Sequence, residues 1–514
     1  MPIRMEEDEP SNRQENNNSN NQGNGGKGIG NIIFMLLPFL IRRPKLLLLV
    51  VAIFGGIYFF KGSGGNGSGN LINSISNITR GCDMDEKVFD QAEVFEPLSP
   101  DQALPEKVSL EKYCPSRGDQ GQQGSCVGWS TSYAARTILE AVRTGKDPNQ
   151  LRYSPAFLYN QISLKGCQGA YMLNAMEKLT QVGDLPYSDF GYTDESCDRK
   201  PNENELNLAQ SHRMKGFNRL TKSGDDYAID FLAIKQNLAQ GAPVTIGMMV
   251  GGTFMSDMAG KKVWIPTEED YSKEGFGGHA MCVIGYDDYL EGGAFQLMNS
   301  WSEDWGDRGF AWVRYKDFAY FTKEAYGLYS MAKINENQTT DFNLKFGLLA
   351  NDDKQLLSLT KVSAQIFKTI EPIQKGSKFK VEVTNTKECY TYVFGEEVDG
   401  SIYTLFPYTT KHSPYCGIVG TRIFPKDYSM KADDVGNKDY IALLITQSPV
   451  DYNKVVSELN KLPKKLNIGE KLGQVLKSEL MDDVEVNIQE DYINLHAASI
   501  HKNATYIVIQ IDKK

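Results

Sequence analysis

The residue types that could carry out a reaction stand in three short stretches, around Cys126, His279 and Asn299. Cys126 follows Gly124 and Ser125 and begins a run of apolar residues with helical spacing, so we expect it at the N-terminus of a helix. The partial positive charge and the backbone N–H groups at that end favour the thiolate, which is the nucleophilic form of cysteine. A thiolate, an imidazole that moves protons and an amide that orients the imidazole together predict attack on a carbonyl carbon.

The two partners of the thiol are expected on neighbouring strands. His279 precedes the apolar residues 280–284, and Asn299 follows the apolar residues 295–298; both runs have the composition of buried strands. Each residue alone also has a structural interpretation, because a cysteine at a helix start is commonly a small buried side chain and a lone strand histidine is commonly structural. The order Cys, His, Asn along one chain favours an active site.

The three stretches resemble the signature blocks of the papain family of cysteine peptidases. QGQQGSCVGWS at residues 120–130 is similar to the family's nucleophile block, HAMCVIGY at residues 279–286 to its histidine block, and NSWSEDWG at residues 299–306 to its asparagine block. The resemblance covers about residues 101–335 and implies an α+β papain-like fold, with a helical subdomain and a β-barrel-like subdomain. The sequence departs from the family pattern at Gln123, Val127, Gly128, Trp129 and Ser302.

The resemblance also implies a role for each matching residue. Cys126 is the nucleophile, and His279 is the general acid and base. Asn299 orients His279, and Trp301 shields the hydrogen bond between them from water. Gln120 and the backbone N–H of Cys126 form the oxyanion hole, which stabilises the tetrahedral intermediate.

The substrate groove of the family contains a Cys-Asn-Gly-Gly segment, which here reads Cys-Gln-Gly-Ala at residues 167–170. Ala170 replaces a glycine that hydrogen-bonds the substrate backbone, so we expect weaker peptide binding. Gly247 and Gly277 replace larger residues, which predicts a roomy apolar pocket for the side chain two residues before the cut; a role of these glycines in strand packing is an equally good interpretation. The substrate-binding residues implied by the resemblance are Gly169, Ala170, Tyr171, Met172, Gly247, Gly278 and Ala280.

The remaining cysteines suggest a disulfide framework. Cys282 lies in a buried run and is expected to be a free thiol. Pairing of near neighbours among the other six predicts the disulfides Cys82–Cys114, Cys167–Cys197 and Cys389–Cys416, although six cysteines allow about fifteen sets of pairs. An extracytoplasmic location permits such bonds.

The N-terminal part predicts a membrane anchor. Residues 1–30 are polar and rich in Asn and Gly, and are expected to be a disordered cytoplasmic tail. An anchor region follows at residues 31–61, with its main span at 46–60, which is shorter than the roughly 20 residues of a usual span and requires tilt or snorkelling lysines. The basic cluster before this span predicts a single-pass protein with a cytoplasmic N-terminus and a periplasmic or cell-surface catalytic domain. A cleaved signal peptide is the alternative.

Residues 62–100 read as a linker and a short pre-catalytic segment, and we expect no control by a long inhibitory prosegment. A separate accessory domain is expected at residues 341–514, with an α+β or β-sandwich-like fold. It is expected to have strands at residues 378–384, 390–394, 402–407, 440–446 and 505–511 and helices near 452–462 and 468–480. Part of it resembles a bacterial domain of unknown function that is often attached to peptidases. We expect a binding role for it, toward a protein or a cell-surface ligand.

The composition of the whole chain is consistent with this interpretation. The 514 residues carry a net charge of −10, which argues against a nucleic-acid binder, and 41% are apolar, which permits large cores. No metal or cofactor is expected. We therefore predict a membrane-tethered cysteine (endo)peptidase that acts outside the cytoplasm on peptide or protein substrates. The alternatives are a catalytically inactive papain-fold binding protein and a cysteine amidase or transpeptidase acting on cell-wall peptides.

Overall fold

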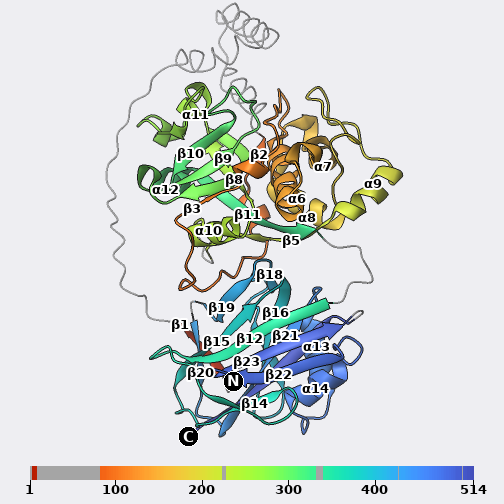
Figure 1. Cartoon of the computed structure of the whole chain (residues 1–514), viewed down its shortest axis with the longest axis vertical. Coiled ribbons are helices and arrows are strands. Elements are labelled where there is room, and N and C mark those ends of the chain that lie inside the picture. Colours follow the sequence, from red (N-terminus) through yellow and green to blue (C-terminus); the bar gives the residue numbers. More distant parts are fainter. Residues whose placement is uncertain (1–2, 8–80, 223–226, 332–339, 427, 500–501) are drawn as a thin grey trace, which may run out of the picture. The chain divides into compact units, whose positions relative to one another are not determined.

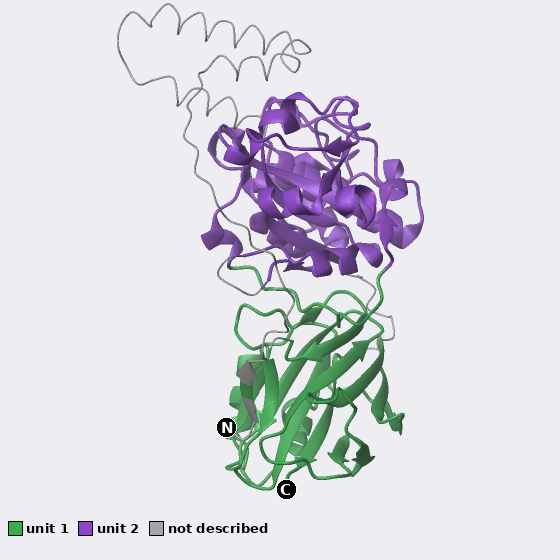
Figure 2. Cartoon of the chain, turned by 90° about the vertical axis from the view of Figure 1, so that its left-hand side faces the viewer, with its two compact units in different colours: residues 1–12, 91–104, 333–514 green, residues 13–90, 105–332 purple. Residues whose placement is uncertain are grey.

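The computed structural model describes residues 3–7, 81–222, 227–331, 340–426, 428–499 and 502–514. The chain divides into two compact units (Figure 2). Unit 1 comprises residues 1–12, 91–104 and 333–514, and unit 2 comprises residues 13–90 and 105–332. Residues 91–104 therefore belong to unit 1, whereas we expected a linker up to residue 100 and the start of the papain-like domain at residue 101.

Unit 2 contains a group of helices, of which the longest runs from Cys126 to Thr144 (Figure 1). Gly145 ends it with φ +68°, a left-handed conformation that glycine adopts without steric cost. The next α-helix starts after Ser154, whose hydroxyl accepts a hydrogen bond from the N–H of Phe157. The helices of this group are α5 (Cys126–Gly128), the π-helical η2 (Trp129–Arg136), α6 (Thr137–Thr144), α7 (Pro155–Ile162), α8 (Met172–Gln181) and α9 (Glu203–Ala209).

The other part of unit 2 is a mostly antiparallel sheet. Its strands are β3 (Lys107–Ser109), β5 (Met214–Arg219), β6 (Val244–Val250), β7 (Val263–Trp264), β8 (Gly277–Asp287), β9 (Ala294–Met298), β10 (Phe310–Arg314) and β11 (Thr322–Met331). They pair in the order β5-β11-β6-β8-β9-β10-β7, and β3 pairs with β8. His279 lies near the start of β8 and Asn299 follows β9, on the two buried strands that the sequence predicts.

Shorter elements complete unit 2. Two short strands pair with each other in parallel, and one of them lies before the helices in the chain. These elements are β2 (Cys82–Asp83), β4 (Ala170–Tyr171), α4 (Glu86–Phe89), α10 (Phe231–Ala239), α11 (Gly252–Ser256) and α12 (Tyr315–Phe321).

Unit 1 is a sandwich of two sheets. One sheet pairs in the order β1-β20-β15-β12-β23-β22, with β19 on β15, and the other in the order β13-β14-β24-β21-β16-β17, with β18 on β16. Strands of the first sheet are β1 (Ile3–Glu7), β12 (Thr340–Ala350), β15 (Lys378–Asn385), β19 (Gly420–Phe424), β20 (Tyr428–Ala432), β22 (Asp483–Gln489) and β23 (Tyr492–Ser499). Strands of the second are β13 (Leu359–Lys361), β14 (Ile366–Thr369), β16 (Cys389–Glu396), β17 (Ile402–Phe406), β18 (Tyr415–Cys416), β21 (Lys438–Thr446) and β24 (Ala504–Asp512).

The alternation of side chains along β21 shows how the layers of unit 1 pack. Ile441 and Leu443 lie in one core with Leu344 of β12, so the two sheets face each other. Ala442 and Leu444 lie in a second core with residues of α13 (Tyr452–Lys461) and α14 (Ile468–Val475), so these helices cover the outer face of the second sheet. The strands and helices that we expected in this region are confirmed.

Residues 91–104 are fixed in unit 1 by backbone hydrogen bonds. The N–H of Val94 donates to the carbonyl of Lys411 at 2.6 Å, and the N–H of Ser99 donates to that of Thr421 at 2.7 Å. The buried Arg422 donates from Nε to the carbonyl of Glu96 at 3.0 Å. The chain thus leaves unit 2 after α4, passes through unit 1 and returns to unit 2 before β3.

The N-terminal residues 3–7, which we expected to be disordered, form strand β1 and pair antiparallel with β20. The predicted anchor at residues 31–61 lies outside the described residues. Within the part of the chain that the structure describes, no helix is both long and apolar enough to cross a bilayer. Strand pairing requires β1 and β20 to lie on one side of any membrane, so this pairing is at odds with a cytoplasmic N-terminus combined with an extracytoplasmic accessory domain.

Candidate active site

Cys126 stands at the N-terminus of the longest helix of unit 2, where the sequence places it. Its side chain is completely buried, and its Sγ accepts a hydrogen bond from the N–H of Ala280 at 3.4 Å. Ala280 is the residue after His279 on β8. The helix start and the strand that carries the histidine therefore meet at the thiol.

The imidazole of His279 is held by two neighbours. Its Nε2 donates to Oδ1 of Asn299 at 2.7 Å, and the same oxygen accepts the N–H of Ser300 at 2.7 Å. Because an amide oxygen can only accept, Nε2 carries a proton. The Trp301 ring stacks on the imidazole, with 4.4 Å between the ring centroids and 28° between the planes. The structure thus brings His279, Asn299 and Trp301 together as the sequence implies.

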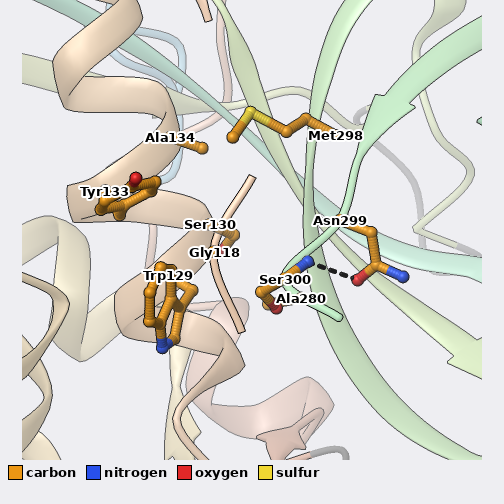
Figure 3. Close-up of a pocket in the computed structure, with 9 residues that line it drawn as sticks. All are labelled: Gly118, Trp129, Ser130, Tyr133, Ala134, Ala280, Met298, Asn299 and Ser300. Carbon is orange, nitrogen blue, oxygen red and sulfur yellow. Dashed lines mark hydrogen bonds between the residues drawn. The ribbon is translucent and has the colours of Figure 1, made fainter. Parts of the chain in front are cut away.

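Gln120 is also completely buried, six positions before Cys126. Its Oε1 accepts a hydrogen bond from Oγ of Ser300 at 2.8 Å, and its Nε2 donates to the carbonyl of Gln123 at 3.0 Å. These bonds fix the amide so that its nitrogen faces the loop that leads to Cys126. Figure 3 shows Asn299 and Ser300 on one side of a small hollow and residues of η2 on the other, so the asparagine lies directly across from the helix.

A segment of the chain's own N-terminal part occupies the predicted substrate groove. Strand β2 pairs with β4, and the N–H of Ala170 donates to the carbonyl of Gly81 at 2.9 Å. The N–H of Gly81 in turn donates to the carbonyl of Gly278 at 3.1 Å. We call residues 81–84 the groove segment. Ala170 therefore pairs with an extended chain, and weaker binding of a substrate peptide at this position stays a prediction.

The groove segment approaches so closely that glycine is required on both sides. A Cβ on Gly81 would lie 2.3 Å from the carbonyl oxygen of Gly124, and one on Gly278 would lie 2.0 Å from that of Cys82. Gly81 also has φ +110°, a conformation that other residues rarely adopt. These neighbours are backbone atoms that cannot rotate away, so a side chain at either glycine would displace the segment.

Burial changes the protonation of the Cys126 thiol. Burial raises the pKa of Cys126 to about 12, and the N–H groups of Ala280, Val127 and Cys126 itself lower it only in part. The thiol is therefore neutral at pH 7 in this arrangement, whereas the helix N-terminus alone predicts a thiolate. We expected no long inhibitory prosegment; the short groove segment was not foreseen.

The residues predicted to form the apolar substrate pocket lie close to a buried carboxylate. Met172 and Ala280 are buried, and Gly247 lies opposite Ala280 in the pairing of β6 with β8. Glu324 of β11, which the sequence analysis missed, lies opposite Gly247 and accepts a hydrogen bond from Sγ of Cys82 at 3.5 Å. Glu324 belongs to none of the motifs, and only the strand register reveals it.

The structure contains one of the three predicted disulfides, Cys167–Cys197. The prediction of Cys82–Cys114 is wrong, because Cys82 contacts Glu324 and Cys114 contacts the carbonyl of Leu110. Cys389 and Cys416 are directly opposite on β16 and β18 but are not bonded. Cys282 is a buried free thiol, as expected. Among the described residues, no group of His, Cys, Asp or Glu side chains has the arrangement of a metal site.

Comparisons with known proteins agree with this geometry. Residues 104–331 match the papain family of cysteine proteases, and residues 373–449 match a domain of unknown function, DUF4384. The chain thus contains a papain-family cysteine protease domain with a papain-like fold, together with a DUF4384 domain, as the two resemblances imply.

Individual relatives are distant. Cathepsin K of Mus musculus is 26% identical over 215 residues, which cover 40% of this chain and 59% of that protein. Cathepsin B-like CP2 of Giardia intestinalis is 27% identical over 202 residues, which cover 37% and 61%. Among solved structures, xylellain, a cysteine protease from Xylella fastidiosa, is 21% identical with a TM-score of 0.41, covering 50% of this chain and 98% of that chain. The chain spans about six tenths of the length of the curated relatives it matches.

Proposed function

We propose that unit 2 is a cysteine peptidase that hydrolyses peptide bonds through a thioester acyl-enzyme. The observation that carries the proposal is the hydrogen bond from Nε2 of His279 to Oδ1 of Asn299, next to a cysteine at a helix N-terminus. This bond orients the ring, so that Nδ1 is the nitrogen that takes and gives protons. The carboxylate of a serine triad orients its histidine in the same way. The family match at residues 104–331 supports the same reaction class.

In the proposed mechanism, His279 takes the thiol proton of Cys126, and the thiolate sulfur forms a bond to the carbonyl carbon of the substrate. The resulting oxyanion accepts hydrogen bonds from the side-chain amide of Gln120 and the backbone N–H of Cys126. The intermediate collapses as the C–N bond breaks, and His279 gives its proton to the leaving amine. Water, deprotonated by His279, then cleaves the thioester and returns the thiol and a carboxylate product.

The buried thiol favours one alternative, a non-catalytic papain-fold binding protein, because a closed groove admits no substrate. We propose instead that the groove segment must move before the enzyme acts. Gly81→Ala is a direct way to displace it, because the added Cβ would meet the carbonyl oxygen of Gly124 at 2.3 Å.

The test is covalent labelling of the full chain carrying Gly81→Ala with a peptidyl epoxide, followed by mass analysis. We expect one equivalent of label on Cys126, no label in the same chain with Cys126→Ala, and much slower labelling with His279→Ala. Hydrolysis of a dye-labelled unfolded protein should follow the same order. A folded Gly81→Ala chain whose Cys126 is reduced yet unreactive would contradict the proposal and favour the binding protein.

A further inference from the structure

Unit 1 has a polar hollow on the outer face of its first sheet. The hollow has a volume of about 410 Å³ and is lined by four neighbouring strands, which pair in the order β15-β12-β23-β22 (Figure 1). This volume lies within the range of roughly 300–1,000 Å³ that ligand sites commonly have. The helices α13 and α14 pack on the second sheet, so the hollow lies on the opposite face of the sandwich.

The alternation of side chains along β12 explains why this face is polar. Phe342, Leu344 and Phe346 lie in the core between the two sheets. Because successive side chains of a strand point to opposite faces, Asn343 and Lys345 point outward and line the hollow. The hollow is therefore built from the polar half of an alternating pattern.

Two rows of outward side chains cross the hollow from β22 through β23 to β12. Register partners place Glu485, His496 and Asn343 in one row and Asn487, Asn494 and Lys345 in the next. Side chains of directly opposite residues are close neighbours on a sheet. A side-chain amide offers both donors and an acceptor, so the rows present hydrogen-bonding groups of both kinds side by side.

Several of these side chains are already held in place by their neighbours. Nζ of Lys345 lies 3.6 Å from the centroid of the Tyr492 ring, and the hydroxyl of Tyr492 donates to Oε1 of Glu382 at 2.9 Å. Nδ1 of His496 lies 3.1 Å from Oδ1 of Asn343. Side chains that are ordered in advance lose less conformational entropy when a ligand binds.

Other groups of the hollow are available to a ligand. Glu485 and Asn487 are exposed, and their side chains form no hydrogen bond or ion pair with another described residue. Asn494 uses its Nδ2 for a long bond to the carbonyl of Tyr492, at 3.4 Å, which leaves its Oδ1 available. The hollow thus combines fixed side chains with unused donors and acceptors.

The lining also excludes several kinds of ligand. Its charges nearly cancel, since Lys345 and Glu485 have opposite signs and the remaining polar residue that can carry a charge is His496. Nucleic acids and other polyanions require a cluster of basic side chains. A protein partner usually contacts large apolar side chains, whereas Leu344 and Leu495 of this lining are buried in the core. Extended peptides usually add to the edge of a sheet rather than to its face.

We propose that this hollow binds an uncharged oligosaccharide. The hydroxyl groups of a sugar donate and accept hydrogen bonds at close spacing, which matches rows of amide and carboxylate side chains without a dominant charge. The inference goes beyond the proposed peptidase function, because it assigns a ligand class to unit 1 and does not depend on the reaction in unit 2.

The test is isothermal titration calorimetry with the full chain, which carries Cys126→Ala so that no probe is cleaved. The neutral probes are cellohexaose, maltohexaose, mannohexaose and chitohexaose. Hexagalacturonate is the anionic comparison, and the oxidised insulin B chain is the peptide comparison. We expect binding of at least one neutral hexasaccharide, and an affinity lowered by about tenfold or more in the double variant Asn487→Ala, Asn494→Ala, which removes two amides from one row.

Two further variants make the result specific. Asn453→Ala is the matched control, because Asn453 is an exposed asparagine of α13, on the layer that covers the second sheet, and its loss should leave binding unchanged. The single variant Asn487→Ala removes an exposed side chain and should weaken binding by about threefold. This single variant keeps the test decisive if the double variant does not fold, which thermal unfolding followed by circular dichroism would reveal.

The outcomes that contradict the inference are distinct. Binding of none of the neutral hexasaccharides would overturn it, and so would binding that a folded double variant retains in full. If only the insulin chain or only hexagalacturonate binds, and this binding depends on Asn487 and Asn494, the hollow is a site for peptides or for anions instead. None of these outcomes would affect the proposal for unit 2, which is tested by labelling of Cys126.

Discussion

At the scale of single residues, the side chains around the thiol are held by hydrogen bonds that leave little freedom. Asn299 contributes the acceptor that fixes His279, and Ser300 contributes both an N–H to Asn299 and a hydroxyl to Gln120. One short turn after β9 thus orients the residues assigned to proton transfer and to the oxyanion hole. A change at Asn299 should therefore affect catalysis more than stability.

We expect Asn299→Ala, in the Gly81→Ala background, to lower kcat/KM by about 100-fold, the lower end of what a positioned proton-transfer group contributes. The physical reason is that Nε2 of His279 loses the amide oxygen of Asn299 as acceptor, so the imidazole can rotate away from the thiol. Peptide hydrolysis under steady-state conditions is the measurement. Asn343→Ala is the control, because it removes a similar but exposed histidine–asparagine bond, to His496 in unit 1, and should leave kcat/KM unchanged.

The sequence could predict these residues because each belongs to a block whose order along the chain is informative. It could not predict Glu324, which lies in no block and meets Gly247 only through the register of β11 with β6. It also could not predict the contact of Cys82, whose partner is 242 positions away in the chain. Spacing along a chain reports local geometry, whereas these contacts depend on tertiary packing.

At the scale of elements, β2 lies along the predicted substrate groove, where it pairs with β4. Its sequence, Cys-Asp, carries no strong strand signal, and its stability comes from pairing with β4. An element held by so few hydrogen bonds is a natural candidate for local opening. The long helix of Cys126 and the strands β8 and β9, by contrast, have clear apolar periodicity and were predicted.

Gly81→Ala should increase the rate of Cys126 alkylation by iodoacetamide at pH 7 by about tenfold or more. Burial holds the pKa of this thiol at about 12 in the closed groove, so opening lowers the pKa and raises the thiolate fraction. A rate profile from pH 6 to pH 10 should show its midpoint at lower pH in the variant. Gly376→Ala is the matched control, since Gly376 also has positive φ but no atom lies within 4 Å of the added Cβ. Equal rates for both variants would contradict the role of the groove segment.

In unit 1, the last strand is held by a buried ion pair. Nζ of Lys513 lies 2.8 Å from Oδ1 of Asp439 and 2.9 Å from Oδ1 of Asp433, and the side chains of Lys513 and Asp439 are completely buried. Lys513→Met should destabilise unit 1 by about 3 kcal/mol, because it leaves buried carboxylates without a cation. Lys461→Met removes only an exposed pair with Glu458 and should cost less than about 0.5 kcal/mol.

Two observations make this measurement specific. All five tryptophans lie in unit 2, so tryptophan fluorescence should be unchanged while hydrogen exchange in β21 and β24 increases. Burial raises the pKa of Asp439 to about 6 even with Lys513 present. Without Lys513, which lowers this pKa, the pKa of Asp439 is higher still, and the folded state binds the proton more tightly than the unfolded state. The Lys513→Met variant should therefore regain stability as the pH falls toward and through 6. A loss that grows on acidification would contradict this account.

At the scale of the whole molecule, the pairing of β1 with β20 conflicts with the predicted membrane span. The pairing puts both strands on one side of a membrane, whereas the span would separate them. Met5 and Met430 are register partners, at a Cα separation that suits a disulfide. The double variant Met5→Cys, Met430→Cys should therefore cross-link on mild oxidation of the full chain, as read by mass analysis after proteolysis. Met5→Cys with Met481→Cys is the control, because Met481 lies just before β22, at the opposite edge of the same sheet. Failure of the first pair to cross-link in membranes would instead favour a span between them.

The path of residues 91–104 has a consequence for how the molecule responds to proteolysis. The chain crosses between the units four times, and the passage of residues 91–104 is held in unit 1 by Val94, Ser99 and the carbonyl of Glu96. A protease that cuts the chain near residue 335 would therefore not separate the two units, because residues 91–104 remain hydrogen-bonded within unit 1. A cut near residue 90 would leave the groove segment in unit 2 with a free end. The segment could then leave the groove while unit 1 stays joined to unit 2 through the other connections.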